Sequence, residues 1–210
     1  MDQAVHSLTT FSSDLLGRIL GLLPGYAASL REVCQQWRAL VANLRLGSMS
    51  LSDLSYQGHA DLLVWAHVKA HPPKALERIM VGAAEGGHEA CMNLAKSWGA
   101  TDYDWAMIHA AEGGYEACMN LAKDWGATDY DEAMICAAGG DHTACMTLAK
   151  SWGATNYDGA MRYAAAGGRV VCMELAKSWG ATNNDRAMAG AAGGGHAACV
   201  KLLKSWGATD

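Results

Sequence analysis

The stretch ATDYDWAMIHAAEGGYEACMNLAKDWG, residues 100–126, decides the fold, because residues 127–153 repeat it as ATDYDEAMICAAGGDHTACMTLAKSWG. Copies follow one another at a period of 27 residues, and columns of identical letters mark that period. Three such columns are Trp98, Trp125, Trp152, Trp179 and Trp206; Met80, Met107, Met134, Met161 and Met188; and Gly86, Gly113, Gly140, Gly167 and Gly194. A fixed period of roughly 20 to 50 residues is typical of solenoids, in which each repeat packs only on its neighbours. We therefore expect residues 75–210 to form five stacked repeats.

Each repeat is predicted to be a pair of helices. Asp104 is suited to cap a helix that begins at Trp105, and the Gly113-Gly114 pair ends it. A second helix is expected from about Tyr115 to Trp125. The predicted fold class is therefore all-α.

The first helix of each repeat has one constant and one variable side. On a helical wheel Met107, Ala110 and Ala111 share a side, and these letters hardly change between copies. We expect that side to be packed and the opposite side, where the letters change, to bind a target. The candidate target-binding residues are those with enough reach or aromatic area: Trp105, Ile108, His109, Glu112, Glu132, Ile135, Arg162, Tyr163 and Arg186.

The second helix carries a cysteine and a lysine that recur in every copy. Equivalent positions in stacked helices lie about 8 to 10 Å apart, too far for a disulfide or a shared zinc ion. We expect reduced, buried thiols at Cys91, Cys118, Cys145, Cys172 and Cys199. The lysines are predicted to form a solvated ladder, neutralised by aspartates of the nearby loops, at Lys96, Lys123, Lys150, Lys177 and Lys204.

Composition and spacing disfavour several other functions. A formal net charge of -5 does not favour nucleic acid, and the longest uncharged stretch near the N-terminus, residues 19–30, is too short to span a membrane. His109 and Cys136 occupy one column of adjacent copies, again about 8 to 10 Å apart, whereas a nucleophile pair needs about 3 Å. We expect no catalytic residue, metal or cofactor, and a chain that is a monomer on its own.

The repeats resemble a known family. The stretch AAEGGHEACMNLAKSWGA, residues 83–100, is similar to the ankyrin repeat pattern A-A-x-x-G-H, an apolar helix and a closing G-A. Ankyrin repeats have about 33 residues, and the deficit here falls in the loop TDYD, where ankyrins carry a β-hairpin finger. The resemblance implies an ankyrin-like solenoid with shortened fingers, in which residues 46–74 are a degenerate capping repeat and 75–210 are five repeats.

Residues 1–45 do not follow the repeat and resemble an F-box. The segment FSSDLLGRILGLLPGYAASLREVCQQWRALVANL, residues 11–44, matches the F-box pattern, with LREVCQQWRAL close to its second half and Ser12 in place of its proline. The resemblance implies three short helices that bind a Skp adaptor through Phe11, Leu15, Leu16, Ile19, Leu20, Leu30, Val33, Cys34 and Trp37. The alternative is an amphipathic helical cap that seals one end of the solenoid.

Together the two resemblances imply a function. F-box segments joined to ankyrin repeats are typical of large DNA viruses and some intracellular bacteria, and the motif WGATDYD is most similar to the short repeats of giant amoeba viruses. Such a protein would link a host target protein to a Skp-cullin-F-box ubiquitin ligase in the cytoplasm or nucleus of the host cell. The alternative is a stoichiometric binding or sequestering module with no ligase link. Neither is an enzyme.

Overall fold

The computed structural model describes residues 50–60, 63 and 73–209, and in this part of the chain it contains helices and no strand. The helices are α4 (Leu51–Tyr56), α6 (Pro73–Glu85), α7 (Glu89–Ser97), α8 (Tyr103–Gly113), α9 (Glu116–Asp124), α10 (Tyr130–Gly140), α11 (Thr143–Ser151), α12 (Tyr157–Ala166), α13 (Val170–Ser178), α14 (Asn184–Gly193) and α15 (Ala197–Ser205). The predicted all-α class is confirmed. Loops without strands stand where ankyrin fingers would be.

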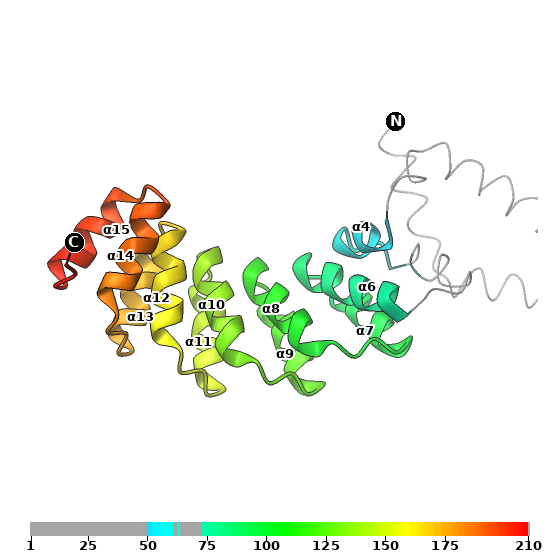
Figure 1. The fold of residues 1–210 in the computed structure, drawn as a ribbon. Coiled ribbons are helices and arrows are strands. Elements are labelled where there is room, and N and C mark those ends of the chain that lie inside the picture. The colour runs from blue at the N-terminus through cyan, green and yellow to red at the C-terminus, as the bar shows by residue number, and fades with distance from the viewer. Residues whose placement is uncertain (1–49, 61–62, 64–72, 210) are drawn as a thin grey trace, which may run out of the picture.

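The helix pairs stack side by side into an elongated array (Figure 1). The first helices of successive repeats, α6, α8, α10, α12 and α14, pack extensively against one another, and α4 packs against α6 in the same way. The second helices pack on the first helix of their own repeat and touch the next second helix at few positions. Because the first helices are closer together, their row forms the inner side of the stack.

The columns of repeated letters form the core. Met107, Ala110 and Ala111 of α8 and Cys118 and Ala122 of α9 are completely buried. Their equivalents in the other repeats are also buried, except Ala192 of the last repeat, which is exposed. Alanines allow neighbouring helices to approach closely, and each methionine fills the remaining space between layers. The predicted packed side is confirmed, and the five column cysteines are buried free thiols.

The first helix begins two residues earlier than predicted, and Asp104 is not its cap. The carboxylate of Asp102 accepts the backbone N–H of Trp105 at 3.3 Å, so Asp102 is the N-cap of α8. Asp104 instead reaches into the next loop, where its Oδ1 accepts the N–H groups of Thr128 at 2.6 Å and Asp129 at 3.0 Å. Both aspartates of the D-Y-D motif are thus used, one within the repeat and one between repeats.

This bond between repeats recurs along the stack. Asp131 holds the loop at Thr155 and Asn156, Asp158 holds the loop at Thr182 and Asn183, and Asp185 reaches Thr209. In the first repeat Glu77 plays this part for Thr101 and Asp102. A carboxylate that accepts N–H groups makes stronger hydrogen bonds than a neutral acceptor. We call these contacts the loop struts; they tie each loop to the preceding first helix.

The lysine column is not the solvated ladder that the sequence predicted. The Nζ of Lys96 lies 4.5 Å from the centroid of the Trp125 ring, and Lys150 lies equally close to Trp179. Lys123 and Lys177 repeat the arrangement over the tryptophans of their next repeats, at 5.1 and 5.7 Å. These cation–π contacts hold the lysines half-buried. The aspartates expected to neutralise them, Asp104, Asp131 and Asp158, accept backbone N–H groups instead.

The turn inside each repeat depends on glycine. Gly114 has φ +83°, and a Cβ there would clash with the ring of His142 in the next repeat. Gly58 and Gly168 receive His88 and His196 in the same way, so these histidines have a structural role. In one repeat Asp141 stands where the others have this glycine, and its φ is 72°. It is the sole non-glycine residue with a positive φ in the described part of the chain. The residue opposite is Arg169, whose Nε donates to the carbonyl of Gly139 at 3.3 Å.

Candidate functional site

On the inner row of first helices, most of the letters that change between repeats reach solvent. Trp105 is 53% exposed and Tyr163 is 42% exposed, so both large rings are accessible to a partner. We call the inner face the surface formed by Trp105, His109, Glu112, Glu132, Cys136, Arg162, Tyr163 and Arg186, all of them exposed or half-buried.

One end of the inner face is an aromatic and acidic cluster on α8. The rings of Trp105 and His109 stack with centroids 5.4 Å apart and an interplanar angle of 28°. The Nδ1 of His109 is buried and lies 3.6 Å from the carboxylate of Glu112, beyond hydrogen-bonding distance. Trp105 therefore rests on its neighbour, yet about half of its surface stays open to a partner.

The other end is aromatic and basic. The guanidinium carbon of Arg162 lies 4.5 Å from the centroid of the Tyr163 ring on α12. Arg186, near the start of α14, is exposed. This contact orders the arginine while leaving part of the tyrosine accessible.

Two of the predicted target-binding residues do not reach the surface. Ile108 is 9% exposed and Ile135 is 5% exposed. The Cδ1 of Ile135 occupies the space where a side chain on Gly159 of the next repeat would lie, 2.8 Å from a Cβ placed there. These isoleucines pack sideways between first helices, so the expectation that they would extend toward a target is wrong. A helical wheel shows only one helix and omits its lateral neighbours.

The inner face is not arranged for nucleophilic catalysis. Burial and, after it, the nearby carboxylates of Glu132, Glu112 and Asp129 together raise the pKa of the Cys136 thiol from 9.0 to about 11. A catalytic thiol needs the opposite shift. The sequence did not predict that these three carboxylates surround Cys136, because they come from two helices and a loop.

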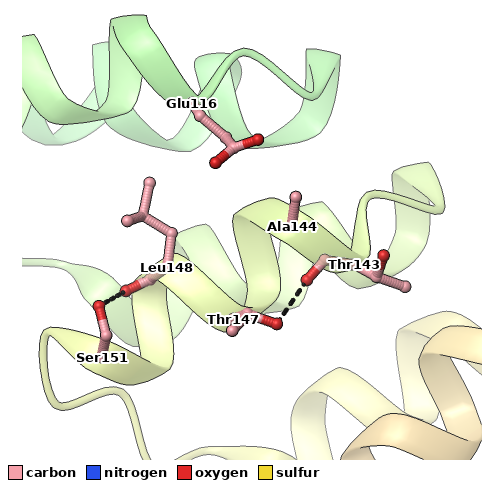
Figure 2. Close-up of a pocket in the computed structure, with 6 residues that line it drawn as sticks. All are labelled: Glu116, Thr143, Ala144, Thr147, Leu148 and Ser151. Carbon is pink, nitrogen blue, oxygen red and sulfur yellow. Dashed lines mark hydrogen bonds between the residues drawn. The ribbon is translucent and has the colours of Figure 1, made fainter.

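The outer side of the stack has a shallow hollow between α9 and α11 (Figure 2), with a volume of about 420 Å³. The hydroxyls of Thr147 and Ser151 donate to carbonyls of their own helix, at 2.8 and 2.6 Å. The proton of each hydroxyl is thus used within α11. The hollow is lined by Glu116, Thr143, Ala144, Thr147, Leu148 and Ser151, with one ionisable group among them.

Within the described ranges, no group of three or more His, Cys, Asp or Glu side chains is placed to hold a metal ion. No helix in that same part of the chain is long and apolar enough to cross a bilayer. All nine residues predicted to bind a Skp adaptor, from Phe11 to Trp37, lie outside the described residues. Of the predicted capping repeat, the described part is mainly α4, which packs on α6 as one first helix packs on another.

Comparison with known proteins identifies the architecture. No family model and no curated protein sequence matches the chain. The human ASB11 ankyrin repeat domain superposes with a TM-score of 0.58 at 21% sequence identity, over 77% of this chain and 85% of that domain. The fold is an ankyrin-repeat-like array. The ankyrin resemblance is thus confirmed for the fold of the described repeats, while the F-box and viral resemblances stay predictions.

Proposed function

We propose that this ankyrin-like array is a protein-binding module whose target meets the inner face. One observation carries the proposal: on the row of first helices, the letters that repeat are buried between repeats, whereas most of the letters that change are accessible. A stack that needs only its constant letters for stability leaves the changed positions free for recognition. The accessible set includes Trp105, Tyr163, Arg162 and Arg186, and Trp, Tyr and Arg dominate binding hot spots.

The proposed role of residues 1–45 is to bring that target to a ubiquitin ligase. It rests on the similarity of LREVCQQWRAL, residues 30–40, to the second half of an F-box. An F-box head would bind a Skp adaptor of a cullin ligase while the array holds the target. Tethering raises the effective concentration of the target beside the ligase, so the chain itself performs no chemistry.

The first experiment tests the binding face. Proximity labelling in transfected eukaryotic cells, with the full chain as bait, identifies candidate targets, and binding of a purified target is then measured. Trp105→Ala and Tyr163→Ala should each weaken binding by about 2 kcal/mol, or roughly 30-fold. Glu116→Ala on α9 is the matched control, because Glu116 is exposed and lines the outer hollow. Loss of binding with Glu116→Ala alone would show that the outer side is the binding face.

A second experiment separates the two roles of the module. Pull-down of the full chain from eukaryotic lysate should recover a Skp adaptor, and the Leu16→Glu/Trp37→Ala variant should lose the adaptor while keeping the target. If the intact protein binds its target and recovers no adaptor, the chain acts as a sequestering binder with no ligase link.

A further inference from the structure

We infer that the inner face selects a protein segment with two oppositely charged ends: a basic end that lies on α8–α10 and an acidic end that lies on α12–α14. This inference rests on the proposed function and adds to it the chemistry and the direction of the target. It follows from how the charges of the inner face are divided between repeats.

The repeated carboxylates do not create the division. Asp104, Asp131, Asp158 and Asp185 all accept backbone N–H groups of the following loop. Each of these aspartates contributes one negative charge to its repeat, partly neutralised by the N–H groups that it accepts. Any difference along the inner face must therefore come from the positions that change.

Among the changed positions of the first helices, the carboxylates lie on α6, α8 and α10. Glu85 and Glu112 are exposed and Glu132 is half-buried. Glu112 and Glu132 come from neighbouring helices. After burial, both carboxylates raise the pKa of the Cys136 thiol, so both contribute negative potential at the same place on α10. Arg78 of α6 lies near enough to Asp53 of α4 to add, after the hydrogen bonds from Ser50, to the lowering of the pKa of that carboxyl. A basic side chain of a partner would meet two carboxylates here, beside the exposed ring of Trp105, which also attracts cations.

The changed positions of α12 and α14 are basic or small, apart from Tyr163. Among the described residues, neither Arg162 nor Arg186 forms an ion pair with a carboxylate. Around them stand residues with no side chain beyond Cβ: Ala166, Ala189, Gly190 and Gly193. A carboxylate of the partner could therefore approach both guanidinium groups without a steric obstacle, and guanidinium groups bind carboxylates in a two-bonded geometry.

The spacing of the repeats sets the length of the segment. The centres of the two halves are two repeats apart, and helices packed side by side lie about 8 to 10 Å apart, so the halves are roughly 16 to 20 Å apart. A helical partner advances about 1.5 Å per residue, so its basic and acidic residues should be separated by about 11 to 13 positions.

The experiment selects binding peptides from a library in which the order of charges is not fixed in advance. A displayed library of 22-residue helical peptides, with Lys, Arg, Asp, Glu, Ala, Leu and Tyr varied at the exposed positions, is selected on the full chain. Counter-selection uses Gly139→Trp. Gly139 lies on α10, in the same column as Glu112 of the preceding repeat and Ala166 of the next, and a Cβ there meets nothing within 4 Å, so the new ring should cover the inner face without disturbing the stack.

Enriched peptides that fail to bind Gly139→Trp should carry a basic and an acidic half about 12 residues apart. Both Glu112→Lys/Glu132→Lys and Arg162→Glu/Arg186→Glu should weaken their binding at least about tenfold, since like charges are then opposed. A benzophenone at the basic end should cross-link to α8 or α10. In the variant that combines Glu112→Lys/Glu132→Lys with Arg162→Glu/Arg186→Glu, the same peptide should bind in the opposite direction, so that its basic end cross-links to α12 or α14.

Other results overturn the inference in distinguishable ways. Inner-face binders with no charge asymmetry, or cross-links spread over both halves, would refute the charge division and leave the proposed function standing. Binders that are indifferent to Gly139→Trp, or no binders at all, would refute the inner face as a binding site and the proposed function with it. A second copy of this chain, placed antiparallel, would also bring the acidic half of each inner face against the basic half of the other. A concentration-dependent dimer in light scattering that Arg162→Glu/Arg186→Glu abolishes would assign the face to self-association.

Discussion

The inner face and the loop edge of the stack use their polar residues in opposite ways. At the loop edge, Asp104 holds the next loop through Thr128, and Lys96 lies over the ring of Trp125. These partners belong to the neighbouring repeat, and the pattern recurs along the chain. On the inner face, the polar groups of Glu112 and Arg186 point to solvent, and no two repeats carry the same set.

The difference separates residues that build the stack from residues that use it. A loop strut works only if the repeat before and the repeat after supply matching groups, so a change in one copy disturbs two. The last repeat shows how a change beside a strut is accommodated. Asn184, next to the strut residue Asp185, replaces the tyrosine of the preceding repeat; it accepts from Lys177 at 2.9 Å and donates to the carbonyl of Trp206 at 2.8 Å. A changed residue on the inner face has no such requirement.

The largest expected effect compares two residues of α8. Met107→Ala should lower the free energy of unfolding by about 2 to 5 kcal/mol, because the methionine is fully buried and the substitution leaves a cavity. Trp105→Ala, two residues away on the inner face, should change it by less than about 1 kcal/mol, the loss of a stacked ring pair. Urea unfolding followed by circular dichroism measures both. Equal losses would show that the inner face also holds the stack together.

A smaller effect is expected at the loop struts. Asp131→Ala removes the acceptor of the Thr155 and Asn156 N–H groups and should cost about 1 to 3 kcal/mol. Asp124→Ala is the control, since Asp124 is exposed at the end of α9, and should cost less than about 0.5 kcal/mol. Hydrogen exchange should show faster opening of the loop at residues 154–156 in the first variant. Unchanged protection there would rule out the strut as a stabilising contact.

Two adjacent glycines should respond with opposite signs. Gly139→Ala should stabilise the chain by about 0.5 to 1 kcal/mol, because the position is helical and a Cβ there meets open space. Gly140→Ala should destabilise it, because a Cβ would lie 2.6 Å from the carbonyl oxygen of Glu112 in the preceding repeat. Thermal unfolding of the pair measures the contrast. Stabilisation by both substitutions would mean that the first helices are not packed as closely as described.

The smallest effect is a labelling rate that leaves stability nearly unchanged. Cys136 should react faster than the buried column thiols but slowly for an accessible one, because a pKa of about 11 instead of 9.0 lowers its thiolate fraction at pH 8 about 100-fold. The rate should rise with pH up to about 11. Glu132→Gln should speed the reaction a fewfold by removing a negative charge, and Glu116→Gln on the outer side should not. Rapid labelling of Cys118 or Cys145 would contradict their place in the core.

The sequence by itself determined the helix pairs, the stack and the buried columns. These follow from two periods, 3.6 residues within a helix and 27 residues between repeats, which place Met107, Ala110 and Cys118 in the core whatever surrounds them. The variable positions Trp105 and Tyr163 could be predicted in the same way. An exposed side of a helix needs no partner to define it.

Contacts across to the next repeat were decided by the tertiary structure alone. Neither period states which side chain lies opposite which, so Asp104 was predicted to cap its own helix although it holds the following loop. Lys123 was predicted to be solvated although it lies over Trp152. Ile135 was predicted to face a target, but it fills the space left by Gly159. Each error has the same physical cause: a side chain with two possible partners takes the one that the stacking angle brings within reach, and that angle depends on all the layers together.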